Sequence, residues 1–184
     1  MRPDLRRKLE SFLKPLYQDL DGVNRLDDME RIAKIARTLH PAKDDRAFEL
    51  LLLFHLLGRW LEKMGNASRT ALTVGDVTEQ ELRQTAASIR RLDQPVTDAE
   101  RAVAAALLID SAGVRGLTEH FTRARREGNS LMDVLRAVLS DVAVPEWFPP
   151  AAEEWLYARR EARREVCKRL LEELALDDAP QKVR

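Results

Sequence analysis

The run of residues 47–64, AFELLLLFHLLGRWLEKM, constrains this chain most, because it is the most apolar stretch in the sequence. Its eight central residues, 50–57, are apolar except for His55. A helix needs about 20 apolar residues to cross a bilayer, so this run is too short to do so. A helix that is apolar on all sides is instead buried in a globular domain. We therefore expect one long, central, buried helix over this range.

Two polar side chains interrupt the apolar run one helical turn apart, His55 and Arg59. An unpaired buried polar group costs roughly 1–3 kcal/mol, so each of these side chains needs a partner or a function. His55 is either a core histidine bonded to a carbonyl or carboxylate, or part of a functional site. Arg59 either binds a phosphate or holds a buried carboxylate. These two residues are the first candidates for a functional site.

Composition limits the classes of protein to consider. The 184 residues suffice for one good core, and one domain is expected. Lys plus Arg and Asp plus Glu number 31 each, so the chain lacks the basic excess typical of a nucleic-acid binder. Cys167 is the one cysteine, which excludes an internal disulfide and favours a reduced, cytoplasmic setting. The first residues lack the continuous apolar region of a secretory signal.

The sequence predicts an all-α fold, because Ala, Leu, Arg and Glu dominate and alternating β-branched runs are nearly absent. We expect a single compact domain of about seven to nine helices. Helical apolar spacing and end signals predict helices near residues 3–13, 26–39, 47–64, 79–92, 98–109, 117–124, 130–139 and 151–174. Residues 1–23 form an N-terminal helical segment packed on the domain, 24–176 form the domain, and 177–184 form a flexible tail.

Several residues mark where these helices begin, end or bend. Pro15 should disturb or end the first helix. Gly113 and Gly116 should allow close backbone approach, and Trp155 is expected on one face of the last helix with Ala162, Val166, Leu170 and Leu174. Helix N-caps are expected at three places: Asp44 or Asp45, Thr78 with Glu81, and Thr97 with Glu100.

Three segments share their order and spacing with a known family. Residues 28–36 read DMERIAKIA, residues 53–59 read LFHLLGR and residues 106–121 read ALLIDSAGVRGLTEHF. Together they resemble the HD-domain family of metal-dependent phosphohydrolases, whose ligands follow the pattern His … His-Asp … Asp. The Arg-rich last helix also resembles the closing helix of that family. The resemblance covers residues 24–174, is closest to small bacterial members that act on nucleotides, and implies an all-α fold and a possible homodimer.

The family's ligand pattern is only partly present. Asp28 stands at the position of the first His, and Leu56 stands where the Asp after His55 would be. Leu107 aligns with the later Asp, unless a gap brings Asp110 into that role. The resemblance therefore implies His55, Asp28 and Asp110 as the metal ligands, if a metal such as Mn, Co, Zn or Mg is bound. Leu56 supplies no lone pair to a metal.

The candidate pocket consists of His55, Arg59, Asp28 and Asp110. Asp110 lies among apolar residues and is expected to be a buried carboxylate that pairs with His55 or Arg59. Asp28 either replaces a ligand, caps the second helix, or pairs with Arg31 or another arginine of the cleft. Two functions follow as alternatives. The first is a catalytically degenerate HD-like module, without a cofactor, that binds a small ligand or a protein. The second is an active phosphohydrolase with a reduced metal site.

The remaining partner expectations are simpler. We expect no membrane association, because no segment is long and apolar enough. The arginines of residues 159–169 alternate with glutamates, which favours a solvated helix face over a nucleic-acid surface. The partner is thus an unknown small ligand or protein, with a homodimer possible.

Overall fold

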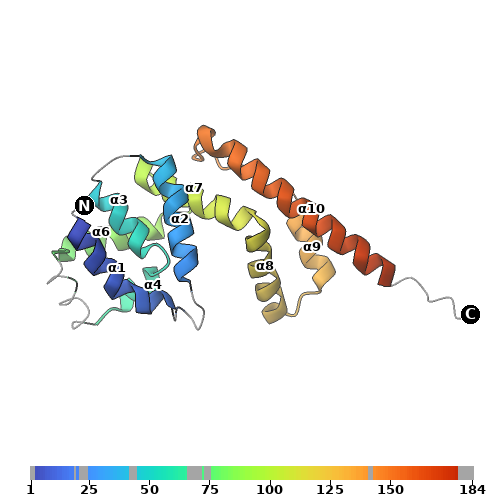
Figure 1. Cartoon of the computed structure of the whole chain (residues 1–184), viewed down its shortest axis with the longest axis horizontal. Coiled ribbons are helices and arrows are strands. Elements are labelled where there is room, and N and C mark those ends of the chain that lie inside the picture. Colours follow the sequence, from blue (N-terminus) through green and yellow to red (C-terminus); the bar gives the residue numbers. More distant parts are fainter. Residues whose placement is uncertain are drawn as a thin grey trace, which may run out of the picture. The chain divides into compact units, whose positions relative to one another are not determined.

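The computed structural model describes residues 3–18, 20, 25–41, 45–65, 72, 76–140 and 143–177. All secondary-structure elements in this part of the chain are helices, so the all-α prediction is confirmed (Figure 1). None of the described helices is both long enough and apolar enough to span a bilayer.

The chain divides into two compact units, Met1–Leu107 and Leu108–Arg184. The boundary between them falls inside residues 24–176, the range assigned above to one domain. That assignment stays a prediction, and each unit is described by itself below.

The first unit is organised around α3 (Arg46–Phe54). This helix packs against α2 (Leu26–Leu39) on one side and α6 (Glu79–Arg90) on another, and α1 (Pro3–Gln18) contacts both α2 and α3. All residues of α3 from Leu50 to Phe54 are at most 2% exposed. The apolar circumference of this segment therefore does predict its burial.

The predicted central helix is not continuous, and this part of the prediction is wrong. The helix α3 ends at Phe54, and a new helix, α4 (Gly58–Lys63), begins after a turn closed by the Leu57 amide and the Phe54 carbonyl at 2.7 Å. The Nδ1 of His55 hydrogen-bonds to the Leu52 carbonyl oxygen. In an uninterrupted helix this carbonyl would instead accept a hydrogen bond from a backbone amide. An ideal Cβ at Gly58 would lie 2.9 Å from Cγ2 of Ile89, so glycine permits α4 to approach α6.

The first helix also differs from the prediction, because it continues through Pro15 to Gln18. Proline removes one backbone donor and disfavours a helix interior. Tyr17 compensates from the far side of Pro15: its ring is fully buried, and its hydroxyl donates a hydrogen bond to the Leu53 carbonyl at 2.9 Å. Tertiary contacts of the last turn thus outweigh the local signal.

The predicted N-caps that fall on described residues are confirmed. The Asp45 side chain accepts from the Phe48 amide at 2.9 Å, while Asp44 lies outside the described residues. Thr78 and Glu81 form a reciprocal capping box at the start of α6. Thr97 and Glu100 form the equivalent pair at α7 (Asp98–Ala112). The Glu100 amide donates to the Thr97 hydroxyl at 3.2 Å, and the Thr97 amide donates to the Glu100 carboxylate at 3.1 Å.

The second unit consists of α8 (Val114–Glu127), α9 (Leu131–Leu139), the short 3-10 helix η1 (Pro150–Ala152) and α10 (Glu153–Asp177). The three long helices contact one another in pairs. Their shared core includes Leu117, Leu135 and Cys167. An ideal Cβ at Gly116 would lie 1.8 Å from the Ser111 carbonyl oxygen. The close approach expected at this glycine is therefore confirmed.

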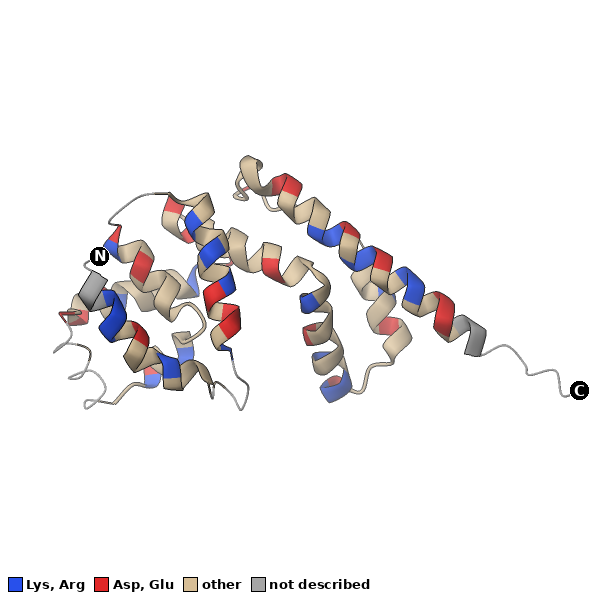
Figure 2. Cartoon of the chain, in the orientation of Figure 1, with Lys and Arg blue, Asp and Glu red and all other residues tan. Residues whose placement is uncertain are grey.

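The long helix α10 carries alternating basic and acidic side chains along much of its length (Figure 2). Arg164 pairs with Glu161 at 3.5 Å, and Arg169 pairs with Glu165 at 3.1 Å, as expected for a solvated face. Arg160 departs from that prediction, since it is only 8% exposed. Trp155, which the sequence places on the apolar face of this helix, has an exposed fraction of 41%. The neighbouring Leu156 is buried in its place, because a helical stripe shifts by about 100° with each residue.

Candidate functional site

His55 is buried and has a defined ring orientation. Its Nδ1 lies 2.7 Å from the carbonyl oxygen of Leu52, one turn back in α3, and its side chain is 5% exposed. A carbonyl can only accept, so Nδ1 carries the proton and Nε2 keeps its lone pair. This bond satisfies a core histidine. The same bond also orients histidines that ligate metals, so both readings of His55 remain.

Asp28 forms ion pairs with two arginines. Its Oδ2 accepts from Arg25 at 3.1 Å and its Oδ1 accepts from Arg31 at 3.0 Å, and the residue is only 5% exposed. The predicted pairing with Arg31 is thus confirmed. The prediction that Asp28 caps α2 is wrong, because the N-cap is Arg25 and Asp28 lies in the first turn, where the helix dipole favours a carboxylate.

The other two candidates differ from these in environment. Arg59 lies on α4 and is exposed, and within the described part of the chain no hydrogen bond or ion pair reaches it. Asp110 lies near the end of α7, beyond the boundary between the units, and is half-buried. The prediction that Asp110 joins His55 and Arg59 in one pocket stays a prediction.

The side chains present do not fit the divalent metal that the ligand pattern implies. Within either unit, no three His, Cys, Asp or Glu side chains of the described residues gather closely enough to hold a metal ion. Each oxygen of Asp28 already accepts from a guanidinium, and Leu56 offers no donor atom. A site for Mn, Co, Zn or Mg normally needs several nitrogen or oxygen ligands around one point.

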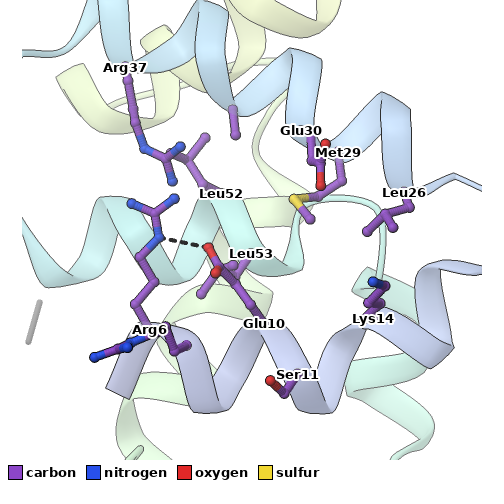
Figure 3. Close-up of a pocket in the computed structure, with 12 residues that line it drawn as sticks. Arg6, Glu10, Ser11, Lys14, Leu26, Met29, Glu30, Arg37, Leu52 and Leu53 are labelled. Atoms are coloured by element: carbon purple, nitrogen blue, oxygen red, sulfur yellow. Dashed lines mark hydrogen bonds and ion pairs between the residues drawn. The ribbon is translucent and has the colours of Figure 1, made fainter. Parts of the chain in front are cut away.

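A groove in the first unit offers a different site (Figure 3). It lies between α1 and α2, has α3 as its floor, and encloses a volume of about 490 Å³. The apolar side chains that line it are Leu26, Met29, Ala33, Leu52 and Leu53, and the polar ones are Arg6, Arg7, Glu10, Ser11, Lys14, Glu30 and Arg37. The groove is therefore apolar at its floor and charged along its walls.

One end of the groove is held by a charge network. Figure 3 shows Arg6 of α1 and Arg37 of α2 reaching toward each other there. Arg6 donates to Glu10 at 2.7 Å, and Arg37 donates two bonds to Glu49 of α3, at 3.1 and 3.0 Å. Glu49 also lies 3.9 Å from Arg6. These contacts join the three helices and fix the width of the groove.

The balance of charge in the groove is positive. Four basic and two acidic side chains line it, and Glu49 adds one more acid, which leaves one positive charge in excess. Lys14 lies at the end away from Arg37 (Figure 3). Among the described residues no ion pair or hydrogen bond reaches its ammonium group. An anionic group placed near Lys14 would thus meet a cation that has no competing acid.

The residues of the groove were not identified from the sequence, although the sequence of α1 contains a pattern that marks its contribution. Arg6, Glu10 and Lys14 recur every four residues, beside the buried stripe of Leu9 and Leu13. Such a stripe marks the edge of a packed helix face. It does not reveal which helix lies opposite, so the contribution of α2 requires the tertiary structure.

No protein-family model matches this chain, and no match was found among curated proteins or solved structures.

Proposed function

We propose that this chain is a catalytically degenerate HD-domain-like protein that binds a ligand and does not hydrolyse phosphate esters. The observation that carries this proposal is the pairing of Asp28 with Arg25 and Arg31. Asp28 occupies the position that the resemblance assigns to the first metal ligand. Its carboxylate is neutralised by two guanidinium groups. The arginines therefore supply the positive charge that a metal ion would otherwise provide.

We propose further that the groove between α1 and α2 is the ligand site, and that the ligand is a small anion with an apolar body. Its volume of about 490 Å³ lies in the range of small-molecule pockets, roughly 300–1,000 Å³. The floor of Met29, Leu52 and Leu53 would receive the apolar body. Lys14 would bind the anionic group, since no acid in the described part of the chain competes for it.

Calorimetric titration with 1-naphthyl phosphate tests this site. We expect one molecule to bind per groove and Lys14→Glu to weaken its binding at least about tenfold, a change of about 1.4 kcal/mol. Lys8→Glu is the matched control, because Lys8 is exposed on the same helix and does not line the groove. Lys8→Glu should stay within about twofold of the wild type, since a distant surface charge is screened.

Three results would refute the groove as the site. One is that 1-naphthyl phosphate shows no saturable binding that Lys14→Glu weakens. Another is an equal loss in the Lys8→Glu and Lys14→Glu variants, which would indicate non-specific attraction. The third is equal affinity for the cationic analogue 1-naphthylmethylamine, which would remove the role of Lys14.

The second candidate function is a metal-dependent phosphohydrolase, and one observation favours it. The Nδ1–H of His55 donates to a backbone carbonyl, which leaves Nε2 as the nitrogen with a lone pair. Histidines that ligate metals are oriented in the same way. Metal binding by the purified protein separates the two functions.

A further inference from the structure

A second pocket lies wholly within the second unit and has no part in the groove described above. It has a volume of about 390 Å³ and lies between α8 and α9, with one side chain contributed by α10. Its apolar lining consists of Ala124, Val134, Ala137 and Val138. Its polar lining consists of His120, Arg123, Glu127, Asn129, Asp133, Ser140 and Arg163.

The acidic side chains of this pocket already have donors. Asn129 donates to Glu127 at 3.2 Å. The Ser130 hydroxyl donates to Asp133 at 2.6 Å, and Arg136 lies 3.9 Å from the same carboxylate. Neither acid therefore needs a cationic ligand.

The basic side chains are in the opposite situation. The Nε of Arg163 is buried and has no hydrogen-bond partner among the described residues, and its Nη1 makes only a long contact of 3.4 Å to the Ser111 carbonyl. No acid within the described part of the chain pairs with Arg163 or with Arg123. A buried donor without an acceptor is unfavourable, so an acceptor supplied by a ligand would be stabilised there.

The charges that act on His120 are mainly positive. The pKa of His120 is lowered by burial and by the charges of Arg163 and Arg123, against a smaller opposing effect of Glu119. Burial likewise lowers the pKa of Arg163, partly offset by Cys167 and reinforced by the charge of Arg160. An imidazole held neutral can still donate one hydrogen bond to an anion.

We propose that this pocket binds the phosphate group of a small organic phosphate monoester. Arg163 and Arg123 bind the phosphate oxygens from α10 and α8, and His120 donates a further hydrogen bond. A phosphate has three terminal oxygens and can satisfy all three groups at once, whereas a carboxylate has only two. The apolar side chains of Ala124, Val134 and Val138 pack against the organic body of the ligand.

Titration with phenyl phosphate tests the proposal, using the full chain with Lys14→Glu so that the groove of the first unit does not contribute. We expect Arg163→Gln and Arg123→Gln each to weaken binding at least about tenfold, because each substitution removes charge-assisted hydrogen bonds to the phosphate. Arg126→Gln is the matched control. Arg126 is exposed on α8, carries the same charge and does not line the pocket. It should change the affinity less than about twofold.

Arg123 is exposed, so Arg123→Gln tests the site even if Arg163→Gln disturbs the packing of α10. The proposal is overturned if phenyl phosphate shows no saturable binding up to about 10 mM. It is also overturned if Arg123→Gln and Arg126→Gln have equal effects. Binding of benzoate as tightly as phenyl phosphate would overturn the assignment to a phosphate.

Discussion

At the scale of single residues, Glu100 shows how a buried charge is stabilised in this fold. Its side chain is 1% exposed, accepts from the Val96 and Thr97 amides at 2.9 and 3.1 Å, and pairs with Arg91 at 2.6 Å. Burial raises the pKa of Glu100, but bonds from Ser88, the two amides and Arg91 outweigh it and lower that pKa to about 2. The sequence predicts the capping role, but not the contacts with Ser88 and Arg91 of the preceding segment.

Stability should therefore depend on the charge of Glu100. The ordinary pKa of 4.5 applies to the unfolded chain and the lowered value to the folded one. The stabilisation is present above about pH 4.5 and is lost as the pH falls toward about 2. Glu100→Gln should lower the free energy of unfolding by about 2–3 kcal/mol at pH 7, measured by urea denaturation.

The difference in unfolding free energy between wild type and Glu100→Gln should narrow as the pH falls from 7 to 3. The control is Asp93→Asn, since Asp93 is exposed in the turn between α6 and α7. It should change the free energy of unfolding by less than about 0.5 kcal/mol. A difference for Glu100→Gln that stays constant over this pH range would show that its carboxylate is not stabilised as described.

His55 and Asp28 show how far the candidate site could be predicted from sequence. Both residues are buried, and the pairing of Asp28 with Arg31 follows from their spacing of three on a helix. The second partner, Arg25, is also three residues from Asp28, but it is the N-cap residue and lies just before the first residue of α2. The exposure of Arg59 follows from the break before α4, which the apolar pattern does not signal.

At the scale of helices, boundaries were predictable where local chemistry sets them and not where tertiary contacts do. The range of α2 and the caps at Asp45, Thr78 and Thr97 agree with the structure, because side chains near in sequence form them. At the start of α4, just after the break, Gly58 lies so close to Ile89 of α6 that a Cβ would come within 2.9 Å of its side chain. Contacts of this kind are not encoded in the local periodicity.

Leu53→Asp should unfold the first unit. Leu53 is 2% exposed in the core that surrounds α3, and the substitution would bury an unpaired charge and remove apolar contacts. We expect a loss of at least about 4 kcal/mol of unfolding free energy, seen by circular dichroism as lost helical signal. Leu131→Asp is the control, because Leu131 is 44% exposed and begins α9, where an acid is favourable. An unchanged melting temperature for Leu53→Asp would contradict the burial of this helix.

Gly116→Ala tests the close approach of Gly116, in α8, to the backbone of Ser111. A Cβ at this position would meet the Ser111 carbonyl, a backbone atom that cannot rotate away. We expect a loss of about 1–3 kcal/mol of unfolding free energy, measured by chemical denaturation. Gly65→Ala is the matched control, since nothing lies within 4 Å of a Cβ there, and it should be nearly neutral. Equal effects of the two substitutions would contradict the close approach at Gly116.

At the scale of the whole molecule, composition predicts the helical class but not the division into two units. The chain has one strongly apolar run, which suggests one core, yet the second unit has its own core formed by α8, α9 and α10. That core contains Leu117, Leu135 and Cys167, which are spread over three amphipathic helices. No single segment of the sequence therefore predicts the core of the second unit.

We propose that the ion pair of Asp28 with Arg25 and Arg31 takes the place of the metal centre that the resemblance implies. The most direct test is the metal content of the purified protein after dialysis against Mn²⁺, Co²⁺ or Zn²⁺ in turn. We expect no stoichiometric metal in any of these, and the same result for His55→Ala, because too few ligands surround one point. One tightly held metal ion per chain, lost in His55→Ala, would contradict the account and favour the phosphohydrolase.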